Sequence, residues 1–349
     1  MKNIFIFLLF GFCNPFICGA KSIHEQKIQP VGEAAAPAKP LLMQPKKFND
    51  GEEIDPSQNP FTISLFKDGE FFCSGTVVGT RPPTVITAAH CMYEHEKNAG
   101  KIEMHFYDKP KGPPIVFQMK SYKTDPAYAR FMDLYRKFIE YTESKGVSIG
   151  TASSETFEKV RSDFFASQSP PITFEQWNQF SQQSSARDVA LLVFHGELET
   201  RGVPPVIVSQ PASSEKNEMF GLVGFGDKST SILNSFVKRK KRTGLVVGKS
   251  DDMNGSHIVA IPDFTKERKK AYPFWRPQVF SGDSGGSLYA LRRVGKAQVL
   301  QGVVHGGAGE PGNPKLWEDI YADLGLDSNQ AFLKEASKDL NTSLQFSQK

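Results

Sequence analysis

Short apolar runs separated by turn-forming residues recur along most of the chain. Runs of about five apolar residues bounded by Gly, Pro, Asn or Asp are typical of antiparallel strands in barrels and sandwiches. The first predicted strands are 61–65, 71–78, 84–88, 101–106 and 115–119. Later ones are 189–194, 206–208, 220–223, 244–247, 257–261, 287–291 and 299–304. The pattern therefore predicts a mainly β fold, an antiparallel barrel or sandwich.

Helical spacing replaces the strand rhythm between residues 125 and 183. Asp125 followed by Pro126 is typical of a helix N-cap and first turn. Apolar residues then recur at helical intervals: Phe131, Leu134, Tyr135 and Phe138. A second helix is predicted at 154–167, and a third starts at Thr173, which has the capping-box partner Gln176. We expect at least two helices here, with the four apolar residues facing the strands.

The two ends of the chain differ in character from this middle part. Residues 1–20 carry Lys2, an apolar stretch and then Gly19 and Ala20, the pattern of a signal peptide that is too short to span a bilayer. Residues 21–47, rich in Ala, Pro, Lys and Gln, are expected to be a flexible leader or propeptide. A helix is predicted at 327–340, followed by a polar tail, 341–349. The mature protein is thus expected to be exported, to an extracellular or periplasmic location.

Charge and cysteine content narrow the range of functions. A formal net charge of +4 over 349 residues gives no global field that favours nucleic acid or a membrane, so neither is expected as a partner. Removal of the signal peptide leaves two cysteines, Cys73 and Cys91. In an oxidising compartment this pair predicts one disulfide, worth about 3 kcal/mol in the loop-entropy model, the alternative being two free buried thiols.

Three local strings carry candidate chemistry. The first is Thr87-Ala88-Ala89-His90-Cys91, which places a histidine, a candidate general base, at the end of an apolar run. In the second, 281–287, glycines on both sides of Ser284 permit a tight backbone that presents its hydroxyl. In the third, Asp188 opens the apolar run 189–194, where its carboxylate can be held away from bulk water. Each string taken alone also fits a structural role.

Taken together, the three strings resemble the motifs of the chymotrypsin/trypsin family of serine proteases, in the same order along the chain. The resemblance extends from about residue 48 to residue 340, which is the expected protease domain. It implies two six-stranded antiparallel β-barrels with the active site between them, here with a helical insertion at about 125–183 and a C-terminal helix. It also implies a Ser-His-Asp triad made of Ser284, His90 and Asp188, and the Cys73–Cys91 bridge next to the histidine.

The same resemblance assigns further site residues. Backbone amides of Gly282 and Ser284 would form the oxyanion hole. Gln278, six residues before Ser284, stands where trypsin has the aspartate that binds Arg or Lys, and no strong preference for those residues is expected. His305 and Gly307 belong to a segment, His305-Gly306-Gly307, that replaces the family's S-W-G string and lines the substrate pocket.

An activation step is also implied by the resemblance. Residues 48–53 are similar to the start of mature family members, and cleavage between Lys47 and Phe48 would free an amino group that pairs with Asp283. The alternative is a leader that is a linker on an already active enzyme. We expect a monomeric endopeptidase that acts on protein or peptide substrates, with no cofactor and no metal.

Two other functions compete with this interpretation. The Gly282-Asp283-Ser284-Gly285-Gly286 string also matches the serine elbow of α/β-hydrolases, but their triad order, Ser then Asp or Glu then His, fails here because no Asp lies between Ser284 and His305. A non-enzymatic binding protein built on a protease fold remains as the alternative from a different class. The 97 residues between His90 and Asp188 contain the insertion, which is either a packed surface decoration or a lid or exosite beside the cleft.

Overall fold

The computed structural model of the chain describes most of the residues after the predicted leader. These are 52–53, 57, 59–93, 101–109, 112–147, 154–198, 206–209, 218–225, 240–249, 257–262, 282–294, 297–308 and 318–347. Short antiparallel strands dominate these residues, as the apolar pattern predicts.

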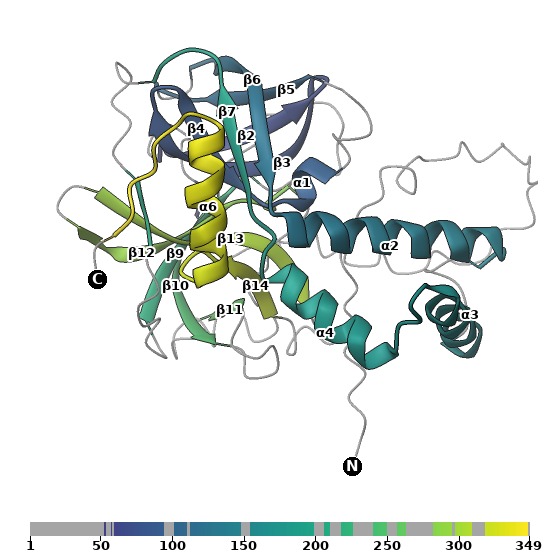
Figure 1. The fold of residues 1–349 in the computed structure, drawn as a ribbon. Helices are drawn as coiled ribbons and strands as arrows, with labels where there is room; N and C mark the ends of the chain where they lie inside the picture. The colour runs from purple at the N-terminus through teal and green to yellow at the C-terminus, as the bar shows by residue number, and fades with distance from the viewer. Residues whose placement is uncertain are drawn as a thin grey trace, which may run out of the picture.

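Six strands of the first half form a closed antiparallel barrel (Figure 1). Its strands are β2 (Thr62–Lys67), β3 (Glu70–Thr80), β4 (Pro83–Thr87), β7 (Ala190–Phe194), β6 (Ile115–Thr124) and β5 (Ile102–Phe106), in that order around the barrel. Strand β5 alternates as the pleat requires, because Ile102, Met104 and Phe106 are buried while the two residues between them are partly exposed. The predicted barrel of the first half is confirmed.

Seven strands of the second half and the short strand β1, which precedes the barrel, form an eight-stranded sheet. Its strands are β1 (Glu52–Glu53), β8 (Val206–Val208), β9 (Glu218–Gly224), β10 (Lys240–Lys249), β11 (His257–Pro262), β12 (Ser287–Val294), β13 (Ala297–Ala308) and β14 (Glu318–Asp323). Strand β9 pairs with both β12 and β10. Strand β8 adds to β13 in parallel, and the other pairings are antiparallel.

A hydrophobic core joins the barrel to the second sheet. It combines buried residues of the barrel, such as Ile86 and Leu191, with residues of the second sheet, such as Val223 and Leu300. Helix α6 (Asp327–Asp339) covers this core through Phe332 and Leu333, and Figure 1 shows it lying across both units. The two sheets therefore form one continuous packed body.

The segment after α6 follows the same junction. Thr342 Oγ1 lies 2.6 Å from Thr84 Oγ1 in the barrel, and Val208 of the second sheet donates its backbone N–H to Gln345. Ser347 in turn donates its backbone N–H to Val208, and Phe346 packs against the shared core. Residues 341–347, predicted as a polar tail, are therefore packed chain in contact with both sheets.

Three helices lie between β6 and β7, as the helical spacing predicts. They are α2 (Pro126–Ser144), α3 (Ser154–Ser167) and α4 (Phe174–Ser185), and they extend to one side of the barrel in Figure 1. Asp125 caps α2 by accepting a hydrogen bond from the backbone of Ala127 at 2.8 Å. Thr173 and Gln176 form the reciprocal pair of a capping box at the start of α4.

The expectation that all four apolar residues of α2 face the barrel is wrong for two of them. Phe131 packs into the barrel core, and Tyr135 contacts both that core and a second cluster. Phe138 and Leu134 belong to the second cluster, which the helices form among themselves with Phe164 and Phe165. The cause is the length of α2, since its distal half extends past the barrel and needs α3 and α4 to cover its apolar face.

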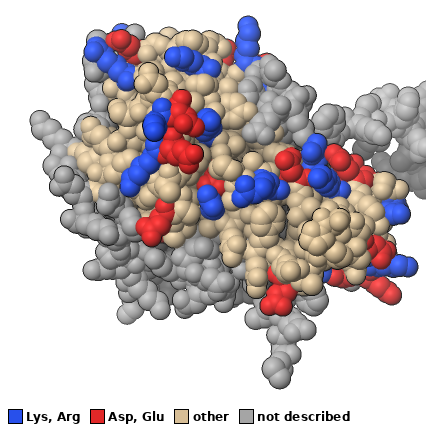
Figure 2. Space-filling view, viewed as in Figure 1, with Lys and Arg blue, Asp and Glu red and all other residues tan. Residues whose placement is uncertain are grey.

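Charge on the outside of the molecule is mixed in sign. On the face drawn in Figure 2, Lys and Arg side chains alternate with Asp and Glu over the barrel and the helices. Among the described residues, no helix has the length and hydropathy needed to span a bilayer.

Candidate active site

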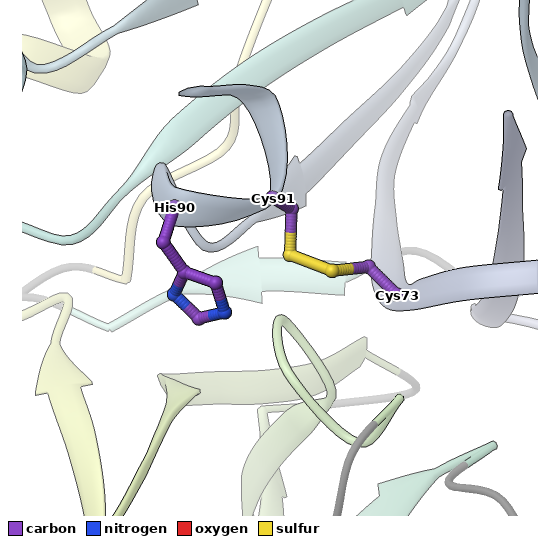
Figure 3. A group of neighbouring side chains, drawn as sticks. All are labelled: Cys73, His90 and Cys91. Carbon is purple, nitrogen blue, oxygen red and sulfur yellow. A yellow bond between two sulfur atoms is a disulfide. The ribbon is translucent and has the colours of Figure 1, made fainter. Parts of the chain in front are cut away.

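His90 begins α1 (His90–Tyr93), directly after β4 leaves the barrel. Its side chain is 15% exposed, while Ala88 and Ala89 before it are buried. A disulfide joins Cys91 to Cys73 of β3, with 6.3 Å between their Cα atoms. Figure 3 shows this bridge tying the turn that carries His90 to the neighbouring strand. The predicted disulfide is confirmed, and it fixes the backbone at the candidate base.

Asp188 lies between α4 and β7 and is fully buried. Its Oδ1 accepts the backbone N–H of His90 at 2.8 Å, and its Oδ2 lies 2.7 Å from His90 Nδ1. Burial alone would raise the pKa of Asp188, but the charge of His90 and the hydrogen bonds and charge of the two neighbouring histidines hold that pKa well below its usual range. The carboxylate is therefore ionised, and it is hydrogen-bonded to both the backbone and the ring of His90.

The second of these histidines is His305 of β13. Its Nδ1 lies 2.5 Å from Asp188 Oδ2, the same oxygen that His90 contacts, and the residue is 9% exposed. The two imidazole rings stand nearly at right angles, with centroids 6.1 Å apart. The sequence assigned His305 to the substrate pocket and gave no sign of this contact with Asp188.

Ser284 is half-buried in the turn that precedes β12. Its backbone carbonyl accepts a hydrogen bond from Ser74 N–H at 2.8 Å, and the Ser74 hydroxyl donates to the carbonyl of Gly282 at 2.8 Å. Ser74 belongs to β3 and follows the bridged Cys73. The serine turn of the second sheet is thus bonded to the same strand of the barrel that the disulfide ties to His90.

Gly285 explains why this turn needs glycine. Its φ of +74° favours glycine, and a Cβ there would lie 2.0 Å from Thr87 Oγ1 and 2.4 Å from the carbonyl oxygen of Ser74. The same Cβ would lie 3.0 Å from the backbone nitrogen of Ala88. The turn therefore packs against the two residues that lead into the helix of His90.

The structure describes some of the other predicted site residues and not the rest. Asp283 is buried, with 3% exposure, beside Gly224, where an added Cβ would lie 2.6 Å from its Oδ1. Gly307 lies in β13, paired with Asp319 of β14. Gln278, Lys47 and Phe48 lie outside the described residues.

Helix α2 reaches the candidate site from the insertion. Tyr93 of α1 donates its hydroxyl hydrogen bond to the carbonyl of Met132 at 3.1 Å. Tyr128 is buried, and burial followed by the charge of Asp188 raises the pKa of its hydroxyl well above the usual value. The first turns of the insertion thus contact the helix of His90 and lie within electrostatic range of Asp188.

Both ends of the insertion meet beside Asp188. Asp125, which precedes α2, accepts a hydrogen bond from Arg187 Nε at 2.9 Å and forms an ion pair with Arg187 Nη2 at 2.8 Å. The backbone N–H of Asp125 also donates to the carbonyl of Val189. We call this Asp125–Arg187 contact the neck of the insertion. Sequence reasoning missed it, because the two residues lie 62 positions apart.

Two groups of side chains bring together residue types that bind metals. Cys73, His90 and Cys91 lie close together, but the two sulfurs form the disulfide and are not thiolate ligands. The reactive atoms of His90, Asp188 and His305 lie within 4.8 Å of one another. Their N···O separations of 2.7 and 2.5 Å are those of hydrogen bonds, whereas ligands on a tetrahedral zinc with bonds of about 2 Å stand about 3.3 Å apart. The observed geometry is a hydrogen-bonded cluster.

The structure combines a closed antiparallel barrel, a buried aspartate bonded to a histidine, and a glycine-bounded serine turn bonded to the barrel strand β3. These are features of the trypsin-like fold that the three motifs resemble. Comparison with known families agrees, because the model of the trypsin family matches residues 48–134, the segment that contains His90 and both bridged cysteines. The resemblance to the trypsin family is therefore confirmed over this segment, which contains the histidine motif but not the strings of Asp188 and Ser284.

Solved structures similar to this chain include human heparin binding protein and a mutant of it. The first is 16% identical, covers 86% of this chain and all of the other, and has a TM-score of 0.49. The mutant is 15% identical, with 83% and 96% covered, and also has a TM-score of 0.49.

Proposed function

We propose that this protein is a serine endopeptidase that hydrolyses peptide bonds through His90, Asp188 and Ser284. The observation that carries the proposal is the pair of hydrogen bonds between Asp188 and His90. Oδ1 accepts the backbone N–H of His90, and Oδ2 bonds to the ring Nδ1. Because Nδ1 is bonded to the carboxylate, the opposite ring nitrogen, Nε2, is left to act as the base. The bonding of the Ser284 turn to Ser74, beside the disulfide, supports a nucleophile held next to that base.

The roles of the three residues follow from the chemistry of acyl transfer. Ser284 Oγ attacks the carbonyl carbon while His90 Nε2 takes its proton, which gives a tetrahedral intermediate. His90 then returns the proton to the leaving amine, and the acyl-enzyme is hydrolysed by water through the same steps. Asp188, ionised and buried, fixes the His90 tautomer with the proton on Nδ1 and stabilises the imidazolium.

The oxyanion is assigned to the backbone amides of Gly282 and Ser284. Gly282 has a φ of +86° and Gly285 one of +74°, which supports a turn that directs successive amides to one side. We also propose that the second sheet is the second barrel of the family. The pairings of β9 with β12 and β10, combined with those through β11, β14 and β13, support a closed ring of six strands.

Hydrolysis of casein by the purified exported form, together with labelling by a serine-reactive fluorophosphonate, tests the proposal. Ser284→Ala should abolish labelling and lower turnover by several orders of magnitude while the circular dichroism spectrum stays unchanged. His90→Ala and Asp188→Asn should lower turnover nearly as much. Ser144→Ala, on the exposed end of α2, is the matched control and should behave as the wild type. Hydrolysis by Ser284→Ala at the wild-type rate would refute the assignment.

A non-enzymatic binding protein on the protease fold is the competing function. It predicts a wild-type protein that neither hydrolyses casein nor reacts with the fluorophosphonate, although it folds. The retained His90, Asp188 and Ser284 favour the enzyme.

The substrate pocket is proposed to lack the charge that selects Arg or Lys. Gln278 is a neutral amide at the expected base of the pocket, and His305 and Gly307 replace residues of the S-W-G string along its wall. We expect the protein to cleave a peptide library after several different residue types. Cleavage confined to Arg and Lys sites would contradict it.

Export and activation are proposed together. A signal peptide at 1–20 and the Cys73–Cys91 disulfide support a secreted protein, and Lys46-Lys47 offers a basic cleavage site before Phe48. The buried carboxylate of Asp283, next to Ser284, is the proposed partner of the new amino group. N-terminal sequencing of the active protein should give Phe48; full activity of a protein that starts at Lys21 would exclude activation by cleavage.

A further inference from the structure

The carboxylate of Asp188 accepts three hydrogen bonds inside the protein. One comes from the backbone N–H of His90 to Oδ1, and the other two come from imidazole nitrogens that share Oδ2. The shorter of these two, 2.5 Å, belongs to His305. A carboxylate oxygen only accepts hydrogen bonds, so the Nδ1 atom of each ring carries a proton and donates it to Asp188 Oδ2.

The backbone of β13 explains why the His305 side chain reaches Asp188. The pairing of β13 with β14 runs from Val304 opposite Tyr321 to Gly306 opposite Ile320, so the register shifts at His305. Such a bulge places an extra residue in one strand and redirects its side chain. His305 therefore leaves the regular alternation of the strand and points its ring at the carboxylate that orients the candidate base.

The contact is made where a hydrogen bond has its greatest effect. Asp188 is fully buried and the His305 side chain is 6% exposed, so the bond between them is shielded from bulk water. Burial opposes the charge on Asp188, and the bond from His305 is one of the interactions that offset this opposition. A carboxylate with Oδ2 bonded on two sides also has less freedom to rotate away from His90.

We infer that His305 is a positioning residue of the active site, whose Nδ1–H holds Asp188 Oδ2 in line with the ring of His90. This role rests on the proposed peptidase function, because it acts on turnover through Asp188 and His90. The site then contains four residues in series: His305, Asp188, His90 and Ser284. At the position of His305 the related S-W-G string has a serine, whose hydroxyl is also a donor.

Matched substitutions isolate the donated hydrogen bond from the shape of the side chain. His305→Asn retains an N–H at about the position of Nδ1, and His305→Leu has nearly the same shape without a donor. His305→Ser and His305→Ala form a second such pair, which serves if a leucine in this buried place prevents folding. His105→Asn, far from the site and beside Glu103, is the control histidine.

The first measurement is the proton spectrum at low field, where imidazole N–H groups bonded to a carboxylate resonate. Two such signals, from His90 and His305, are expected from the wild type and from Ser284→Ala, because the contact of His105 with Glu103 is longer, at 3.4 Å, and partly exposed. One of the two is expected to disappear in every His305 variant but not in His105→Asn. A wild type with a single low-field signal overturns the inference.

The second measurement is kinetic. His305→Leu should lower kcat about tenfold relative to His305→Asn, the loss of one charge-assisted bond, with KM unchanged. His305→Ala should fall in the same way relative to His305→Ser. Equal kcat within each pair refutes the positioning role while the peptidase function stands. Two low-field signals in a wild type that hydrolyses nothing refute the peptidase function instead, and the contact with Asp188 remains.

Discussion

The contacts at the neck of the insertion allow the loss of stability on substitution of Asp125 to be worked out. The side chain of Asp125 is fully buried, accepts hydrogen bonds from Ala127 N–H and Arg187 Nε, and forms an ion pair with Arg187 Nη2. The cap is worth about 1 kcal/mol. The charge-assisted bond from Arg187 Nε, together with the ion pair of Nη2, would add up to about 3 kcal/mol at full burial, but the Arg187 side chain is 33% exposed and we discount this to about 2 kcal/mol. Asp125→Ala should therefore lower the free energy of unfolding by about 3 kcal/mol.

Two further variants separate the cap from the ion pair. Asp125→Asn keeps an oxygen for the cap and loses the charge, so it should cost about 1–2 kcal/mol. Arg187→Met removes the partner of the buried carboxylate and leaves it with the cap bond from Ala127. It should therefore lower the free energy of unfolding more than Asp125→Asn does. Asp133→Ala, also in α2 but 60% exposed, is the control and should change stability by less than about 0.5 kcal/mol.

Urea unfolding followed by circular dichroism measures these values. A double-mutant cycle of Asp125→Ala with Arg187→Met should give a coupling energy of about 1–2 kcal/mol. Because Arg187 precedes Asp188, loss of the pair should also lower kcat. A stability of Asp125→Ala equal to that of Asp133→Ala would refute the claim that the neck holds the insertion to the barrel.

Three other predictions concern single features of the site. Reduction of the Cys73–Cys91 bridge, or replacement of both residues by serine, should lower stability by about 3 kcal/mol in thermal unfolding. Gly285→Ala should cost more than about 3 kcal/mol, whereas Gly69→Ala, also at positive φ but with open space around it, should cost about 1 kcal/mol; similar melting temperatures would contradict the crowding at Gly285. The pKa of Asp188 is lower in the folded than in the unfolded state, so its contribution to stability is present above about pH 4 and is lost as the pH falls through the lowered folded pKa. The fall in stability between pH 4 and pH 2 should therefore be shallower in Asp188→Asn, as measured by urea unfolding across that range.

Local strings of sequence predict local structure well in this protein. The apolar runs correspond to strands because burial on a pleated surface selects β-branched and aromatic residues, and β4, β5 and β7 were expected within a residue or two. Asp125 and Thr173 were recognised as helix caps because a cap is satisfied within three residues of itself. The Cys73–Cys91 bridge was predicted because few cysteines leave few pairings.

Contacts between distant segments escape this kind of reasoning. The register shift at His305 depends on how β13 pairs with β14, and nothing in the string His305-Gly306-Gly307 specifies it. The pairing of Asp125 with Arg187 requires that both ends of a helical insertion return to one point. The side of α2 that holds Phe138 was misjudged because the apolar partner, the α3–α4 pair, is itself part of the insertion.

The packed segment after α6, residues 341–347, bears on how the two sheets stay together. Thr342 touches the barrel, and Gln345 and Ser347 bond to the strand Val206–Val208 of the second sheet, while Phe346 fills part of the core they share. Proteolytic loss of this segment would therefore weaken the junction between the barrel and the second sheet. The segment 341–347 thus links the two sheets independently of the strands themselves.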